Sequence, residues 1–187
     1  MHAWLCTDPT GVDNLRWTEL PTPTPGKGEV LVRIHAASLN FPDLLIVQNK
    51  YQMKPELPFV PGSEYAGVIE AIGEGVQHLR VGQRVAALSG TGGFGTHTLA
   101  PAKLCMPLPD AFSFEDAAAF IMTYATSYHA LIDRGALRAD ETVLVLGAAG
   151  GVGTAAIQIA KAQGARVIAA ASTDDKCALC REIGADA

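Results

Sequence analysis

Residues 142–172 contain the most regular pattern of hydrophobic and polar positions in the chain. Residues 143–146 are apolar at consecutive positions, which is typical of a strand buried on both faces of a parallel sheet. A second apolar run, residues 167–171, follows Gly164. Between the two runs, apolar positions recur at helical spacing: Val152, Ala155, Ala156, Ile159 and Ala160. The order of strand, glycine turn, helix and strand predicts a βαβ unit.

Two glycines mark the turn between the first strand and the helix. Gly150 would let the backbone approach a pyrophosphate, and Gly153 would let helix and strand pack closely. The N–H groups of a helix N-terminus favour phosphate. The residues predicted to hold a dinucleotide here are Ala149, Gly150, Gly151, Val152 and Gly153. A tight structural turn is the alternative interpretation of the glycines alone, but the surrounding pattern favours dinucleotide binding.

The end of the second strand indicates which dinucleotide binds. NAD sites usually place Asp or Glu there, whereas this chain has Ser172, followed by Lys176 one helical turn later. A hydroxyl and an ammonium group suit the 2′-phosphate of NADPH, which a carboxylate would repel. Alternatively, Ser172 caps a helix and Lys176 is solvated, and Asp174 or Asp175 reaches a ribose. The pattern favours NADPH over NADH.

The first part of the chain is rich in short predicted strands. The predicted strands are residues 29–36, 65–72, 84–88, 96–100 and 104–108. Their density of turns predicts an antiparallel barrel or sandwich. Helices are predicted at residues 113–121, with a capped start at Ser113, and at residues 126–133. The fold class is therefore α/β with a β-rich N-terminal part, and we expect domains at residues 1–122 and 123–187.

Composition and charge exclude several classes of protein. The chain has 187 residues and a net charge of −5, which gives no reason to expect nucleic acid or a membrane as a partner. The N-terminus does not resemble a signal peptide, so a cytoplasmic location is expected. Cys177 and Cys180 are close in sequence, but no second pair completes a zinc site. We interpret the four cysteines as free thiols of a reducing compartment.

The chain ends after two strands of a sheet that normally has six. At roughly 30 residues for each strand and helix, on the order of 100 residues would complete it. We therefore expect the 187 residues to be part of a longer protein.

Several stretches together resemble the medium-chain dehydrogenase/reductase superfamily, in its zinc-free quinone oxidoreductase branch. The stretches that carry this resemblance, which covers the whole chain, are residues 25–33, 39–44, 58–64, 66–68, 81–85, 126–130 and 146–161. The resemblance implies a GroES-like β-barrel domain followed by the first half of a Rossmann doubly wound parallel sheet. It also implies an active site between the two domains and a homodimer in the full-length form.

The resemblance also implies the site residues. Zinc members carry Cys where this chain has Asn40 and His where it has Ser63, so we expect no metal. Asn40, Asp43, Tyr51 and Thr126 match positions that line the nicotinamide and substrate pocket, and Lys176 matches a 2′-phosphate ligand. Without the resemblance, a turn after the strand, a loop aromatic and a helix-capping threonine would explain these four pocket residues.

The implied function is NADPH-dependent hydride transfer to a quinone or an α,β-unsaturated carbonyl (an enone). The cofactor supplies the hydride chemistry. A donor near the acceptor's carbonyl oxygen would stabilise the developing charge, and Asn40, Tyr51 or a ribose hydroxyl could serve. An enoyl-thioester reductase of the same superfamily and a non-enzymatic nucleotide-binding protein are the two other hypotheses.

Overall fold

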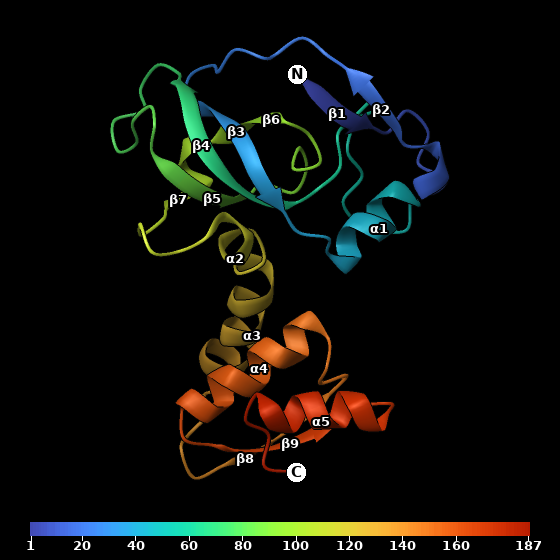
Figure 1. Cartoon of the computed structure of the whole chain (residues 1–187), viewed down its shortest axis with the longest axis vertical. Helices are drawn as coiled ribbons and strands as arrows, with labels where there is room; N and C mark the ends of the chain where they lie inside the picture. Colours follow the sequence, from blue (N-terminus) through green and yellow to red (C-terminus); the bar gives the residue numbers. More distant parts are fainter. The chain divides into compact units, whose positions relative to one another are not determined.

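The computed structural model describes all residues from 1 to 187. The chain divides into two compact units, Met1–Ala119 and Phe120–Ala187 (Figure 1). The expected boundary, between residues 122 and 123, lies three residues beyond the observed division. Each unit has its own hydrophobic core and is described separately.

Unit 1, Met1–Ala119, is built on one antiparallel sheet. Its elements are β1 (His2–Leu5), η1 (Val12–Asn14), β2 (Arg16–Glu19), β3 (Glu29–Ala37), α1 (Phe41–Val47), β4 (Glu64–Ile72), β5 (Arg84–Leu88), β6 (His97–Pro101), η2 (Ala102–Leu104), β7 (Cys105–Pro107) and α2 (Phe114–Ala118). Five strands pair in the order β6-β3-β4-β5-β7, and β1 pairs with β2 in a separate hairpin. These strands include all five that the sequence predicts.

The core of unit 1 consists mainly of side chains from the strands of its five-stranded sheet. Val30 and Val32 of β3 are fully buried with Tyr65 and Ile69 of β4. The outward positions of β3 carry Arg33, which is exposed and pairs with Glu70. Val30, Leu31 and Val32 are buried at consecutive positions, so one side of β3 is solvated only from Arg33 onward.

Three elements near the N-terminus have no clear signal in the hydropathy pattern. They are β1, β2 and α1. The strands of the hairpin have four residues each, and the two tryptophans that it carries, Trp4 and Trp17, are each about half exposed. Helix α1 follows Asn40 directly and has seven residues. The turn that the sequence suggested after β3 is therefore the start of a helix.

Unit 2, Phe120–Ala187, contains the βαβ unit that the sequence predicts. Its elements are η3 (Ile121–Ala125), α3 (Thr126–Tyr128), η4 (His129–Arg134), β8 (Thr142–Leu146), α4 (Gly151–Ala162), β9 (Arg166–Ala170) and α5 (Asp174–Glu182). Strands β8 and β9 run parallel, with Thr142 opposite Arg166 and Leu146 opposite Ala170. Helix α4 ends before Gly164, whose φ of +81° suits a residue without a side chain.

The structure corrects two expectations about burial in unit 2. Strand β8 is not buried on both faces: Val145 is 8% exposed, whereas Leu144 is 59% and Leu146 is 75% exposed. The core forms on one face only, where Ile157 of α4 and Cys180 of α5 pack against Val145. The exposed side chains of Leu144 and Leu146 lie on the opposite face of the strand.

The buried face of α4 also differs from the predicted stripe. Ala155 and Ala160 are buried as expected, but Val152 is 46% exposed and Ile157 is fully buried instead. Helix α4 contacts η3 and α3 as well as the two strands, so its buried positions spread over more than one face. A single stripe at helical spacing describes only a helix with one partner.

No helix of the structure is both long enough and apolar enough to cross a membrane.

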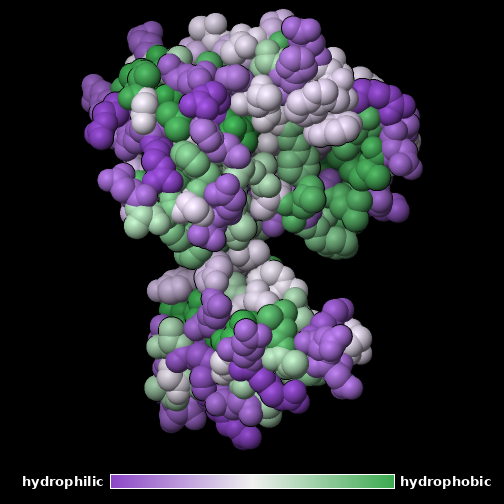
Figure 2. All heavy atoms as spheres, viewed as in Figure 1, coloured by the Kyte–Doolittle hydropathy of each residue, from purple (hydrophilic) through white to green (hydrophobic).

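Exposed hydrophobic side chains gather on unit 1 around α1 and the neighbouring segment of η1 (Figure 2). They include Val12, Leu39, Phe41 and Leu44.

Candidate functional site

The loop between β8 and α4 has the conformation that a pyrophosphate-binding turn requires. Gly147 adopts a left-handed φ of +63°, and Gly150 is the extended residue from which α4 starts. A Cβ at Gly153 would lie 2.6 Å from the carbonyl oxygens of Gly147 and Ala148, so only glycine lets the helix pack this close. A Cβ at Gly150 would meet only the Gly147 oxygen, at 3.3 Å. The space beside Gly150 is therefore open to a ligand.

A cavity of about 430 Å³ connects this loop with the end of β9. It is lined by Gly147, Ala149, Gly150, Ala170, Ala171, Ser172 and Lys176. The structure thus brings together four of the predicted cofactor residues, Ala149, Gly150, Ser172 and Lys176. Of the other four, Gly151, Val152 and Gly153 form the first turn of α4, and Thr126, at the start of α3, does not line the cavity. The cavity lies at the carboxyl ends of the two parallel strands, where α/β folds bind ligands.

Ser172 and Lys176 form a polar pair at one end of this cavity. The Lys176 ammonium donates a hydrogen bond to the Ser172 hydroxyl, with an Nζ–Oγ distance of 3.3 Å. Ser172 does not cap α5; Thr173 does, accepting from the Lys176 backbone N–H at 3.4 Å. Asp174 and Asp175 lie in the first turn of α5 and do not line the cavity. The Ser172 hydroxyl and the Lys176 ammonium therefore lie close enough together for one 2′-phosphate to contact both.

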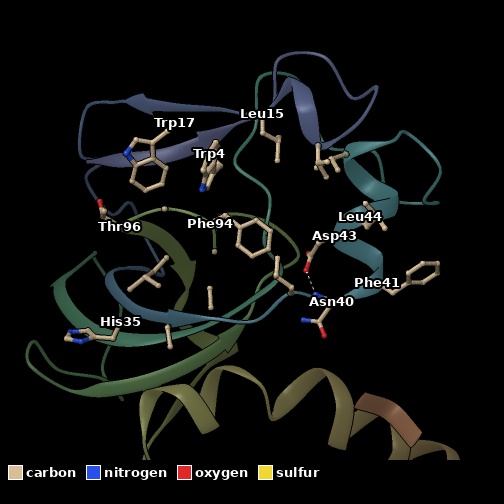
Figure 3. A pocket seen from close by; sticks show the side chains of 18 residues that line it. Trp4, Leu15, Trp17, His35, Asn40, Phe41, Asp43, Leu44, Phe94 and Thr96 are labelled. Atoms are coloured by element: carbon tan, nitrogen blue, oxygen red, sulfur yellow. Dashed lines mark hydrogen bonds between the residues drawn. The ribbon is translucent and has the colours of Figure 1, made fainter. Parts of the chain in front are cut away.

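A larger cavity, of about 810 Å³, lies within unit 1 (Figure 3). Its walls come from the β1–β2 hairpin, β3, α1 and the loop before β6. Most of its lining is apolar, including Trp4, Trp17, Phe94 and Leu44, with Asn40 and Asp43 among the few polar residues. Such a lining suits an apolar ligand whose orientation is fixed by a few polar groups.

Asp43 holds the start of α1 in place. Its carboxylate is 3% exposed and accepts three hydrogen bonds, from the Asn40 backbone N–H at 2.9 Å and from the Ser63 N–H and hydroxyl at 3.0 and 2.6 Å. The first of these bonds satisfies an unpaired donor of the helix N-terminus. The two bonds from Ser63 connect α1 to the residue that precedes β4. Asp43 therefore positions Asn40.

The Asn40 side chain belongs to a second polar cluster. Its carboxamide nitrogen donates to the Ser38 hydroxyl at 2.9 Å and to the Glu64 carboxylate at 3.2 Å. The Ser38 hydroxyl also donates to Glu64, at 2.7 Å. Sequence reasoning missed Ser38 and Glu64. Glu64 belongs to residues 58–64, one of the stretches that carry the family resemblance. Nothing in the hydropathy pattern shows that its side chain is buried toward Asn40.

The other two predicted catalytic residues do not join this cluster. Tyr51 packs against Cys6, Ile46 and Phe59 and does not line the cavity. Thr126 belongs to unit 2, where it is exposed at the start of α3. Its neighbour Ser127 is buried and donates to the Val152 carbonyl at 2.8 Å, which joins α3 to the first turn of α4.

Two family models match the chain. The alcohol dehydrogenase GroES-like domain matches residues 26–110, within unit 1. The zinc-binding dehydrogenase model matches residues 151–187, from the start of α4 onward. The two matches occur in the same order as the expected domains.

Known proteins resemble the chain in sequence and in structure. The human quinone oxidoreductase is 39% identical over 159 residues, covering 84% of this chain and 48% of that protein. The rat synaptic vesicle membrane protein VAT-1 homolog is 42% identical, covering 81% and 38%. The quinone oxidoreductase of Thermus thermophilus, whose crystal structures include a complex with NADPH, is 41% identical with a TM-score of 0.88, covering 100% and 58%. The chain thus spans less than half the length of these two curated relatives.

Proposed function

Because the chain belongs to the medium-chain dehydrogenase/reductase superfamily, in its quinone oxidoreductase branch, we propose that the complete protein transfers a hydride from NADPH to a quinone or an enone. The observation that carries this proposal is the cavity at the ends of β8 and β9, with Ser172 and Lys176 in the position where NAD sites usually place a carboxylate. The solved relatives complexed with NADPH support the same cofactor.

In this proposal the residues of unit 2 hold the cofactor. The turn around Gly150 takes the pyrophosphate, since its backbone is open on the ligand side and α4 starts there. Lys176 and Ser172 take the 2′-phosphate through charge-assisted hydrogen bonds. The bound NADPH supplies the hydride, and Thr126 is proposed to lie near it.

The residues of unit 1 receive the acceptor. The apolar cavity beside Asn40 suits a flat, uncharged quinone ring or an enone, because such molecules have few polar groups. Reduction adds one hydride and one proton, and water can supply the proton because an enolate or hydroquinone anion is basic. Asn40 contacts the acceptor, Asp43 positions Asn40, and Tyr51 supports α1 by packing against Ile46.

The proposal includes independence from zinc. Asn40 and Ser63 stand where the resemblance places the Cys and His ligands of zinc members. The Ser63 hydroxyl is already bonded to Asp43, and the Asn40 carboxamide nitrogen to Ser38 and Glu64. Amide nitrogen and a bonded hydroxyl are poor zinc ligands beside thiolate and imidazole.

A cytoplasmic location and a homodimeric assembly are also part of the proposal. All four cysteines are free thiols, which suits a reducing compartment. Light scattering on the complete protein tests the assembly, and a mass of one chain would contradict it.

The test of the proposed function is turnover by the complete protein. NADPH oxidation is followed with 1,4-naphthoquinone, with an enone such as 1-octen-3-one and with a crotonyl thioester, each with and without prolonged chelation. We expect turnover of a quinone or the enone that chelation leaves unchanged. A preference for the thioester would favour the enoyl-thioester reductase, and NADPH binding without turnover would favour a nucleotide-binding protein.

A further inference from the structure

Glu64 is a fully buried carboxylate at the first position of β4. A charged side chain is rarely buried completely unless it has partners. Two of its partners come from the segment that joins β3 to α1: the Ser38 hydroxyl, at 2.7 Å, and the Asn40 carboxamide nitrogen, at 3.2 Å. Glu64 therefore reaches the side chain that the proposed function places beside the acceptor.

These contacts determine which end of the Asn40 carboxamide meets a ligand. The amide nitrogen has two N–H groups, and both have acceptors, one in Ser38 and one in Glu64. The Glu64 oxygen that the Asn40 nitrogen meets also accepts from the Ser38 hydroxyl, so reversing the amide would set its oxygen against another acceptor. The backbone N–H of Asn40 is bonded to Asp43. The carboxamide oxygen faces the backbone N–H of Asp43 in the capping box of α1, and its second lone pair can serve a further partner.

We propose that Glu64 and Ser38 are positioning residues that hold the nitrogen of the Asn40 carboxamide, so that this lining residue of the unit 1 cavity offers a ligand its oxygen, a hydrogen-bond acceptor. Asn40 is then not the donor that stabilises charge on a carbonyl oxygen, as the sequence suggested. It binds a hydroxyl group instead. The ligand class is a ring that carries a hydroxyl, such as the hydroquinone product or a hydroxyquinone substrate. This inference deepens the proposed function and rests on it for the ligand, but not for the orientation of the amide.

The orientation is tested by nuclear magnetic resonance on the complete protein labelled with ¹⁵N-asparagine. The Asn40 side-chain signal is identified by its loss in Asn40→Asp. We expect its two amide protons to exchange with water at least about tenfold more slowly than those of the exposed Asn49, because both are hydrogen-bonded. Glu64→Gln should reduce this protection, and Ser38→Ala serves as the second variant should Glu64→Gln fail to fold.

Binding measurements test whether the Asn40 oxygen accepts a hydrogen bond from the ligand. Affinities for 1,4-naphthohydroquinone and for its dimethyl ether are measured by calorimetry without oxygen, on the wild type and on Asn40→Ala. One lost hydrogen bond should weaken the hydroquinone by about threefold to tenfold and leave the ether unchanged. A matched control is Asn49→Ala, outside the cavity, which should change neither affinity.

Three outcomes would overturn the inference. Rapid exchange of the Asn40 amide protons in the wild type, or protection that Glu64→Gln and Ser38→Ala both leave intact, would show that these residues do not position the amide. Weaker binding of both ring compounds in Asn40→Ala would show that Asn40 gives no specific bond to a hydroxyl. Absence of turnover with every quinone, together with the expected exchange pattern, would instead refute the proposed function and leave the orientation established.

Discussion

Two side chains, Ser172 and Lys176, determine the proposed preference for NADPH. They line the same cavity as Gly150, and the carboxylates nearby, Asp174 and Asp175, lie on the first turn of α5 instead. Because a phosphate carries two negative charges and three acceptor oxygens, an ammonium at this point distinguishes it from a ribose hydroxyl.

Lys176→Ala in the complete protein should therefore weaken NADPH binding by about 1.5–3 kcal/mol, the range for a hydrogen bond to a charged group, and leave NADH nearly unchanged. Titration calorimetry with both cofactors measures this. Lys103→Ala removes the same charge from an exposed position in unit 1 and should change neither affinity. Equal losses for both cofactors in Lys176→Ala would refute the assignment.

The two glycines of the turn should respond differently to a side chain. Gly150 has ordinary dihedral angles and space beside it, so Gly150→Val should keep the fold and abolish NADPH binding. Gly153→Ala would force a Cβ against two carbonyl oxygens and should lower the free energy of unfolding by about 1–3 kcal/mol. Calorimetry measures NADPH binding and urea unfolding measures stability, so the two methods separate the effects. Undiminished NADPH binding by Gly150→Val would show that the phosphate site lies elsewhere.

At the scale of elements, the hydropathy pattern predicts regular and long segments better than short ones. The five strands of the unit 1 sheet and the βαβ unit follow from apolar runs and glycines, so they appear in the sequence. The hairpin of β1 and β2 and the seven-residue α1 depend on tertiary contacts instead, and their tryptophans and leucines are partly exposed. Asn40 and Asp43 are recognisable from the resemblance, but their partners Glu64 and Ser63 come from another strand segment and become visible only in the fold.

The elements also determine how reactive the cysteines are. Burial raises the pKa of the Cys105 thiol on β7 to about 11, and burial raises the pKa of Cys6 as well. A raised pKa means little thiolate at pH 8, and the thiolate is the nucleophile. Cys180 is buried on the inner side of α5, whereas Cys177 is partly exposed.

Iodoacetamide at pH 8 should accordingly modify Cys177 well before Cys6, Cys105 and Cys180 in the complete protein. Peptide mapping by mass spectrometry at increasing times checks the order. Rapid modification of Cys105 would contradict the burial of this side chain on β7, the edge strand that pairs with β5.

At the scale of the whole molecule, one face of the parallel sheet remains without cover. Leu144 and Leu146 are more than half exposed on the face opposite α4 and α5. Exposed apolar neighbours of this kind favour association. The chain covers 57–62% of the solved relatives' chains, so each of those chains has residues beyond the matched ones.

A polypeptide limited to residues 1–187 should therefore associate with itself and show no hydride transfer. Light scattering and NADPH turnover, recorded beside the complete protein, test this. The double variant Leu144→Ser and Leu146→Ser of the same polypeptide should associate less, because it removes apolar surface from that face. A monomeric polypeptide with full turnover would mean that two parallel strands suffice to hold the cofactor.

The fate of the hydride tests the central claim most directly. The complete protein is supplied with NADPH deuterated at either face of nicotinamide C4, together with 1-octen-3-one, and the product is analysed by mass spectrometry. The account predicts one deuterium on the β-carbon from one of the two labelled cofactors, with chelation having no effect. Reduced product without cofactor-derived deuterium, or no reduced product from either the enone or a quinone, would contradict it.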